Sequence, residues 1–442
     1  MQDMVNTSEV DDPRVLLLQA PMSGFQWRAV ATIIALCALD GFDVFSMTFA
    51  APAVLRDWGI DKAQLGIALS AGLLGMAAGS LFLSPLADTL GRRRVMFAAL
   101  AIMVLGTGWT AVAADMSSLT LSRVFTGLGI GAMIGVIMPL AAEYANASRR
   151  DRAVALFGLG FPAGGILGGL VAAYLLAHFG WRGIFVAASV FGIALGAVAY
   201  WTLLEPVALV IAKPGANALA EVNNYLSKCG HPPVERLPAP PENRKVPIRR
   251  LFEPGMASVT IMVTLIYFLV VIPVFFMQTW LPTLIADLGI LPAKAALISA
   301  FFSLGGVTAG IAIAWLVVRW GLRALLNIAL IGSAVMIIGF SLLPADPIKL
   351  VIAAAIAGLF VQGSMIALYA VVARTFPAEM RASGSGFVVG IGRIGSILPP
   401  MLAGGLAVAG FSRSGIALTM AVPALVAMAL LTRFVIRSPT TA

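Results

Sequence analysis

The sequence predicts an all-α membrane protein whose twelve transmembrane helices form two related bundles of six. Three observations predict this fold class. First, 60% of the 442 residues are hydrophobic and only 11% are charged, whereas soluble domains carry about 25% charged residues. Second, most apolar stretches run for about 18 to 25 residues, which is long enough to cross a bilayer core of roughly 30 Å as a helix. Third, the two halves of the chain resemble each other at one fixed offset.

The apolar runs give the expected order of the spans. The segment ahead of the first span is polar and acidic, so we expect no cleavable signal peptide. The expected spans are 28–55, 63–86, 94–113, 118–142, 153–177, 183–204, 256–284, 294–317, 324–343, 348–373, 383–409 and 414–435.

The net charge of +9 is explained by where the basic residues lie. With the N-terminus inside, about 21 of the 29 Lys and Arg residues fall on the inner side and about 6 on the outer side, as the positive-inside rule requires. Arg92–Arg94 and Arg149–Arg152 are clusters on this inner side. The basicity therefore indicates an integral membrane protein with both termini in the cytoplasm, and it excludes nucleic acid as a partner.

A polar, proline-rich segment divides the chain in the middle. We expect an N-terminal six-helix bundle at 1–204, a cytoplasmic linker at 205–253 and a C-terminal six-helix bundle at 254–442. Ala216–Cys229 is expected to form a short amphipathic helix in the linker, and we favour a role as a spacer for it.

The two bundles repeat at an offset of about 230 residues. Six spans in each half bring both copies into the membrane from the same side, so we expect a parallel repeat with its axis along the membrane normal and a central cavity between the bundles. The matched residues are Pro52 with Pro282, Gly59 with Gly289, Gly75 with Gly305, and Gly91 with Gly321.

Four charged side chains lie well inside expected spans and break the repeat: Asp40, Asp43, Arg123 and Arg393. A charge near the bilayer centre costs at least about 2.5 to 3.5 kcal/mol, so such residues are functional candidates. Asp40 and Asp43 are three residues apart and share one helix face. We favour a role in handling protons or substrate; the alternative is that they only pair with arginines to hold the bundle together.

The two arginines each offer a planar, permanently charged fork that matches a carboxylate. We expect one to bind an anionic substrate and the other to pair with Asp40 or Asp43. Arg393 is favoured for the substrate because it is deeper in its span, and Arg123 for proton coupling. Aromatic side chains near these charges are candidates for the walls around a flat substrate: Phe42, Phe45, Trp280, Tyr369 and Phe387.

Nothing in the chain predicts bond-making chemistry. His178 and His231 both fall in loops, and Cys37 and Cys229 differ in context, so we expect no metal site, no disulfide and no cofactor. The outer loops are short and lack clustered His, Ser or paired acids, so we do not expect an enzyme.

The segment Ser84-Pro85-Leu86-Ala87-Asp88-Thr89-Leu90-Gly91-Arg92-Arg93-Arg94 resembles the signature loop of the major facilitator superfamily, and 318–323 resembles an eroded copy of it. The resemblance implies the major facilitator fold. It also implies that Asp88, Gly91, Arg92 and Arg93 act as an inner gate, with Asp88 pairing with neighbouring arginines and with the start of span 11 near Ala382–Ser385.

More narrowly, four segments resemble the aromatic acid:proton symporter family: Asp40-Gly41-Phe42-Asp43 with Ala51-Pro52, Glu143, Phe376–Gly384, and Gly392–Gly395. The resemblance implies import of benzoate-like or hydroxybenzoate-like acids with protons, and it adds Glu143 to the proton-coupling residues. We expect a monomer in the bacterial inner membrane. Two alternatives stay open. One is a symporter of aliphatic or sugar-acid carboxylates. The other is a proton-driven efflux antiporter, because Gly160–Gly165 partly resembles an antiporter motif.

Overall fold

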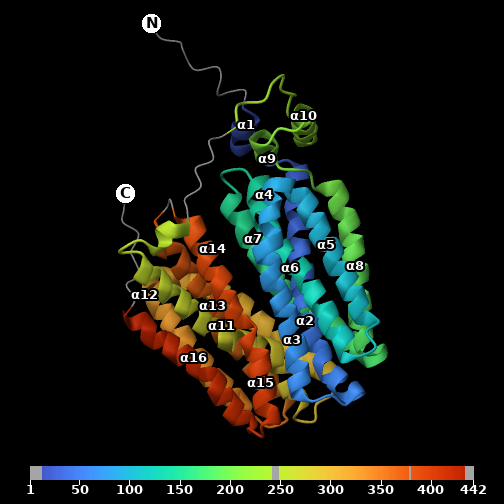
Figure 1. The fold of residues 1–442 in the computed structure, drawn as a ribbon, viewed down its shortest axis with the longest axis vertical. Coiled ribbons are helices and arrows are strands. Elements are labelled where there is room, and N and C mark those ends of the chain that lie inside the picture. The colour runs from blue at the N-terminus through green and yellow to red at the C-terminus, as the bar shows by residue number, and fades with distance from the viewer. Residues whose placement is uncertain (1–11, 241–247, 378–379, 434–442) are drawn as a thin grey trace.

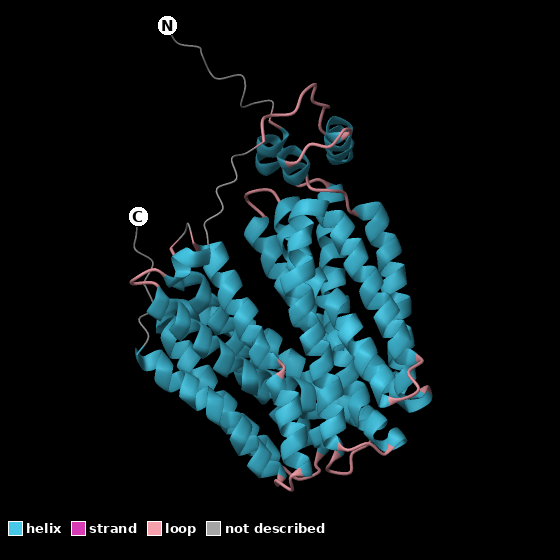
Figure 2. Ribbon diagram, in the orientation of Figure 1, coloured by secondary structure: helices cyan, strands magenta, loops and turns pink. Residues whose placement is uncertain are grey.

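The computed structural model describes residues 12–240, 248–377 and 380–433, and the secondary structure of this part of the chain is entirely helical. Two bundles stand side by side, the N-terminal one in blue to green and the C-terminal one in yellow to red (Figures 1 and 2). The helices of the first half are α1 (Pro13–Gln19), α2 (Gly24–Trp58), α3 (Lys62–Ala78), η1 (Gly79–Leu83), η2 (Ser84–Leu86), α4 (Ala87–Leu90), α5 (Arg92–Ala111), α6 (Met116–Tyr144), α7 (Arg150–His178) and α8 (Gly180–Thr202).

The linker and the second half continue the helical pattern. Their elements are α9 (Val207–Ala212), α10 (Ala218–Cys229), η3 (Ile248–Phe252), α11 (Ala257–Ala286), α12 (Pro292–Ser341), α13 (Pro347–Thr375), α14 (Arg381–Gly392), η4 (Arg393–Ser396), α15 (Leu398–Val408) and α16 (Arg413–Arg433).

The described residues contain 11 helices that are long and apolar enough to cross a membrane, and α12 counts as two spans. Its 50 residues would extend for about 75 Å, more than twice a bilayer core. Gly321 interrupts it with a φ of 74° and a ψ of 158°, so the chain turns back there. The predicted fold of twelve spans is confirmed.

The internal repeat is visible in the backbone. Glycines 230 residues apart share the left-handed conformation that a side chain rarely adopts. Their φ angles are 61° and 84° at Gly59 and Gly289, 101° and 74° at Gly91 and Gly321, and 68° and 84° at Gly180 and Gly410.

The matched glycines inside the helices serve close packing. Gly75 lies against the backbone of α6 at Val124, and Gly305 lies against the backbone of α13 at Ala355. A methyl group at either position would overlap the facing carbonyl oxygen, so each glycine lets two helix backbones approach closely.

Among the described residues, the two bundles contact each other from the middle of the molecule to one end. We call the end that carries α1, α9 and α10 the linker side and the opposite end the far side (Figure 1). Near the far side, Lys62 Nζ lies 2.6 Å from Asp287 Oδ2, and Ser70 Oγ donates a hydrogen bond of 2.7 Å to the carbonyl of Ile397. Toward the linker side the ribbons of the two bundles diverge (Figures 1 and 2). The halves are therefore closed against each other on the far side.

The first part of the linker is folded onto the N-terminal bundle. The expected amphipathic helix is present as α10, with Val222, Tyr225 and Leu226 buried in the same apolar cluster as α2 and α6. The ring of Tyr225 meets that of Phe25 edge-on, with centroids 5.6 Å apart. The interpretation of this helix as a spacer is wrong, because its apolar face forms part of the core.

Substitution of the repeat glycines tests this packing. Gly75→Ala and Gly305→Ala are each expected to lower the stability of the purified protein by about 1 to 3 kcal/mol, because the added methyl group overpacks a backbone contact. Thermal unfolding in detergent measures the loss. Gly405→Ala, at a helical glycine with no atom within 4 Å of the added group, is the control. Equal melting temperatures for all three variants would contradict the prediction.

Candidate functional site

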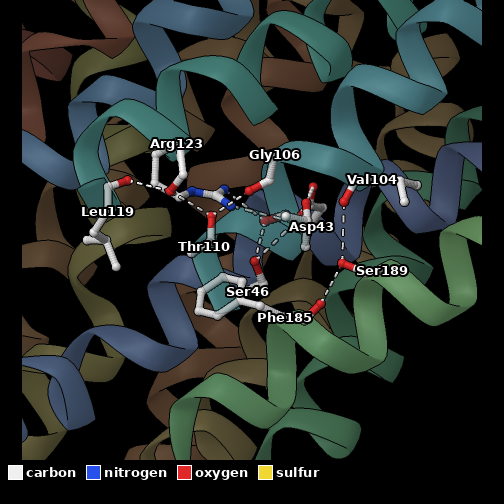
Figure 3. A network of polar contacts seen from close by, with 11 residues as sticks. Asp43, Ser46, Val104, Gly106, Thr110, Leu119, Arg123, Phe185 and Ser189 are labelled. Atoms are coloured by element: carbon white, nitrogen blue, oxygen red, sulfur yellow. Dashed lines mark hydrogen bonds and ion pairs between the residues drawn. The ribbon is translucent and has the colours of Figure 1, made fainter. Parts of the chain in front are cut away.

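A buried ion pair links two helices in the middle of the N-terminal bundle. Asp43 of α2 is 1% exposed and Arg123 of α6 is 3% exposed. The closest charged atoms, Arg123 Nη1 and Asp43 Oδ1, are 3.7 Å apart, and Arg123 Nη2 donates a hydrogen bond of 3.2 Å to the Asp43 carbonyl. Figure 3 shows the two side chains pointing toward each other. The predicted pairing of Arg123 with one of the two aspartates is therefore observed.

Hydroxyl groups complete the surroundings of Asp43. Thr107 Oγ1 donates a hydrogen bond of 2.7 Å to Asp43 Oδ2. Ser46 Oγ lies 3.3 Å from Oδ1 and 2.6 Å from the carbonyl oxygen of the same residue. The hydrogen bond from Thr107 and the positive charge of Arg123 thus oppose the cost of burying the Asp43 carboxylate.

Asp40 lies one turn earlier on α2, in a different environment. It is 0% exposed, and neither of its carboxyl oxygens has a hydrogen-bond partner. A buried charge without a partner is costly, so Asp40 is stable here only as the neutral acid. Two adjacent carboxyl groups on one helix thus occupy opposite states, one paired and one unpaired.

A pocket opens beside this pair, between the two halves. In this state it is narrow, with a volume of about 20 Å³, which is room for about one water molecule. Arg123 lines it together with Thr48 of α2 and Gln278 of α11. Arg123 Nη1 donates no hydrogen bond, and it lies 3.7 Å from Asp43 Oδ1. The guanidinium therefore contacts Asp43 on one side and the pocket on the other.

Arg393 lies in the opposite half. It begins η4, the short 3₁₀ turn that separates α14 from α15, and it is half-buried. The preceding Gly392 packs against the ring of Tyr267, whose hydroxyl donates a hydrogen bond of 3.3 Å to Tyr369. Eight residues, or about 12 Å of helix, separate Tyr267 from the pocket residue Phe275. Arg393 thus lies on the linker side of the pocket, beside two tyrosines.

The structure disperses the aromatic side chains that the sequence singled out. Phe42 and Phe45 pack against α7, at Gly168 and Phe161 respectively. Trp280 faces a second pocket near the far side. Phe387 meets Phe252 edge-on, with centroids 5.2 Å apart, and Tyr369 contacts Tyr267. Their role in substrate binding stays a prediction.

The expected gate forms a network of charges at the linker side of the N-terminal bundle. Arg92 Nη2 lies 3.0 Å from Glu143 Oε1 and 3.9 Å from Asp88 Oδ1. Glu143 is some 20 residues, or about 30 Å of α6, away from Arg123. The structure thus places Glu143 with the gate residues and far from Asp40 and Asp43.

The Asp88 side chain is 66% exposed, and Arg92 is its ion-pair partner. Its predicted contact with the start of span 11 stays a prediction for a state that is closed on the linker side. Ala378 and Glu379, which belong to the expected motif before span 11, lie outside the described residues.

Glu205, at the start of the linker, belongs to the same network of charges and was not predicted from the sequence. Its carboxylate accepts backbone hydrogen bonds of 2.6 Å from Arg92 and 3.0 Å from Arg93, and so caps the first turn of α5. Gly91, with a φ of 101°, turns the chain so that these amides face the carboxylate. Glu205 stands where span 6 ends, a position at which acidic residues are ordinary, so only the fold reveals the contact.

Comparison with known proteins decides the family. The sequence matches the Major Facilitator Superfamily over residues 32–348 and 263–442. The chain belongs to this superfamily. It is a transporter and not an enzyme, as predicted.

Two similar proteins indicate the family to which the chain belongs within the superfamily. The gallate transporter of Pseudomonas putida is 31% identical over 389 residues, covering 87% of this chain and 86% of that protein. The 4-hydroxybenzoate transporter PcaK of Pseudomonas aeruginosa is 31% identical over 425 residues, covering 95% and 94%. The predicted membership in the aromatic acid:proton symporters of the major facilitator superfamily is confirmed.

Solved structures of other members of the superfamily share the fold. A D-xylose-proton symporter superposes with a TM-score of 0.73 at 16% identity, covering 93% of this chain and 98% of that one. A bacterial homologue of the human lysosomal transporter Spinster gives a TM-score of 0.70 at 16% identity, covering 95% and 100%.

We expect the thermal stability of this major facilitator protein to depend on pH because of Glu205. Burial raises the pKa of Glu205, and this effect exceeds the lowering by the amides of Arg92 and Arg93. Folding therefore disfavours the ionised form. As the pH rises above the ordinary glutamate value of about 4.3, wild type should lose thermal stability relative to Glu205→Gln, which cannot ionise.

Melting temperatures of both proteins between about pH 4 and pH 8 measure this difference. Glu235→Gln, at an exposed glutamate of the same linker, is the control for the loss of a carboxylate. A difference between wild type and Glu205→Gln that stays constant, or that shifts in favour of wild type at high pH, would contradict the prediction.

Proposed function

We propose that this protein imports aromatic carboxylates together with protons by alternating access, with the linker side facing the cytoplasm. The observation that carries the proposal is the buried Asp43–Arg123 pair at the wall of a pocket between the two halves. A guanidinium that contacts both an aspartate and the pocket can exchange one carboxylate for another.

The names of the relatives support the substrate class. Gallate and 4-hydroxybenzoate, the substrates in the names of the two proteins described above, each consist of one aromatic ring with one carboxylate. The pocket provides one cation from Arg123, polar groups from Thr48 and Gln278, and an apolar wall that includes Phe275. A flat apolar ring with a single anionic group fits this combination.

Competition for Arg123 supplies the proposed coupling. When Asp43 takes up a proton, the ion pair is lost and Arg123 is left as a buried charge without a counter-ion, which is strongly unfavourable. A substrate carboxylate in the pocket then becomes the counter-ion. Release of the proton restores the original pair and displaces the substrate, so proton and substrate enter and leave together.

Asp40 serves in this scheme as the second proton-binding group. It is one helical turn from Asp43 on the same face of α2, and it lacks any partner that would stabilise its charge. A proton on Asp40 is therefore available to Asp43 without exposure of either group to the pocket.

Arg393 is proposed to receive the anion on its way to the linker side. It lies there in the half opposite Arg123, where the hydroxyls of Tyr267 and Tyr369 can bind the ring substituents of a hydroxylated substrate. The closed far side prevents the substrate from leaving by the route through which it came.

The orientation rests on the charges at the linker side. Arg92 and Arg93 lie there, and the positive-inside rule assigns such a surface to the cytoplasm. We propose the bacterial inner membrane as the location, with a single chain as the working unit.

Substitution of the carboxyl groups tests the coupling. Asp40→Asn should abolish accumulation of 4-hydroxybenzoate in proteoliposomes under an inward proton gradient and leave thermal stability unchanged, because a neutral amide replaces a neutral acid. Asp43→Asn should abolish accumulation and also destabilise the fold by about 3 to 5 kcal/mol, since Arg123 loses its counter-ion. Counterflow of labelled substrate, which needs no net proton movement, should persist in Asp40→Asn.

The control is Asp57→Asn, at an exposed aspartate that pairs with its neighbour Arg56. Wild-type accumulation in the Asp40→Asn and Asp43→Asn proteins would refute proton coupling through these residues. Accumulation driven by an outward proton gradient would instead favour an antiporter.

Substitution of Arg393 and a panel of acids test the substrate class. Arg393→Ala should raise the KM for 4-hydroxybenzoate uptake about ten- to a hundredfold, the loss expected for one charge-assisted hydrogen bond. Benzoate derivatives should compete with labelled 4-hydroxybenzoate, whereas aliphatic and sugar acids should not. Equal competition by both classes would overturn the aromatic assignment.

A further inference from the structure

A second pocket lies near the far side, between α3 of one half and α11, α15 and α16 of the other. Its volume is about 110 Å³, larger than the 20 Å³ of the pocket beside Arg123. Its walls are mainly apolar and aromatic, with Phe276 and Trp280 from α11 and Phe411 from the loop between α15 and α16. Three charged residues, Lys62, Asp287 and Arg413, also line it.

The charges in this pocket do not balance. Lys62 and Asp287 form an ion pair of 2.6 Å, and both side chains are partly exposed to the far side. The guanidinium of Arg413 is held by backbone carbonyls at the end of α12, with hydrogen bonds of 2.7 Å to Ser341, 2.9 Å to Leu343 and 3.4 Å to Phe340. Two cations thus share one carboxylate, and the pocket has an excess positive charge.

A buried hydrogen-bond donor, the indole N–H of Trp280, also lines this pocket. The Trp280 side chain is 3% exposed, and its indole N–H has no hydrogen-bond partner. A buried donor without an acceptor is unfavourable, and buried polar groups are normally satisfied. Trp280 lies one turn beyond Phe276 and one turn before Leu284, so all three lie on the same stripe of α11 that lines the pocket.

We propose that this pocket is an outer binding site. An aromatic carboxylate binds here before it reaches the site beside Arg123. The aromatic ring packs against Phe276 and Phe411. The carboxylate accepts the Trp280 N–H and pairs with Lys62, taking the place of Asp287, while Arg413 adds a nearby positive charge. This inference rests on the proposed function, which supplies the substrate class.

The site would also act on the closure of the far side. Lys62 belongs to the first half and Asp287 to the second, so their ion pair joins the two bundles. A substrate that takes Lys62 from Asp287 removes this link at the moment of binding. The substrate thereby favours the opening through which it enters.

Equilibrium binding of radiolabelled 4-hydroxybenzoate to the purified full-length protein tests the proposal. Wild type should bind two molecules per chain. Trp280→Phe, which keeps an aromatic ring but removes the donor, and Lys62→Gln should each weaken the outer site about tenfold or more. Asp287→Asn should tighten it, because the competing carboxylate is gone. The opposite direction of this change separates ligand competition from general damage to the fold.

Two further variants distinguish the outer site from other charged residues and from the inner site. Lys349→Gln removes a far-side lysine that pairs with Asp346 outside the pocket, and it should leave both sites unchanged. Gln278→Ala, in the pocket beside Arg123, should weaken the inner site and leave the outer one. One molecule per wild-type chain, with uptake intact and no effect of Trp280→Phe, Lys62→Gln or Asp287→Asn on binding, would overturn the outer site alone. No binding and no uptake of any aromatic carboxylate by wild type would overturn the proposed function as well.

Discussion

Burial of the charges on Asp43 and Arg123 is the constraint on which the arrangement of the N-terminal bundle depends. Neither residue is stable at this depth as a lone ion, so each fixes the position of the other and of the helix that carries it. Thr107 and Ser46 are oriented by the same carboxylate. Because Arg123 also lines the pocket, any anion that binds there must compete with an aspartate inside the protein.

The two halves share their backbone scaffold but differ in their buried charges. Paired glycines give both bundles the same turns and the same close helix contacts. At the positions that correspond to Asp40 and Asp43, the second half carries Val270 and Pro273, which are buried and apolar. Architecture is therefore shared, whereas the buried carboxyl groups proposed to bind protons belong to the first half.

The sequence was informative wherever one residue stands out against an apolar background. Asp40, Asp43 and Arg123 were predictable for this reason, and Gly321 marked the break within α12 because it matches Gly91. The places of Trp280 and Phe42 were not predictable, since they depend on how each helix is rotated about its axis.

Residues at the ends of spans were harder to interpret for a related reason. Glu205 and Glu143 lie where charged residues are common, so their pairing with the first turn of α5 and with Arg92 becomes visible only in three dimensions. The place of α10 in the core depends likewise on a tertiary contact, between Tyr225 and Phe25.

The 3₁₀ turn η4 divides span 11 into two helices, α14 and α15. Below it, α15 packs against the other half, where Gly404 lies on the backbone of Lys62; above it, α14 packs within its own half, where Gly392 lies on Tyr267. Short 3₁₀ stretches inside helices are frequent hinge positions. One end of the span can therefore stay anchored across the bundle interface while the other end swings, and Arg393 sits at the pivot between them.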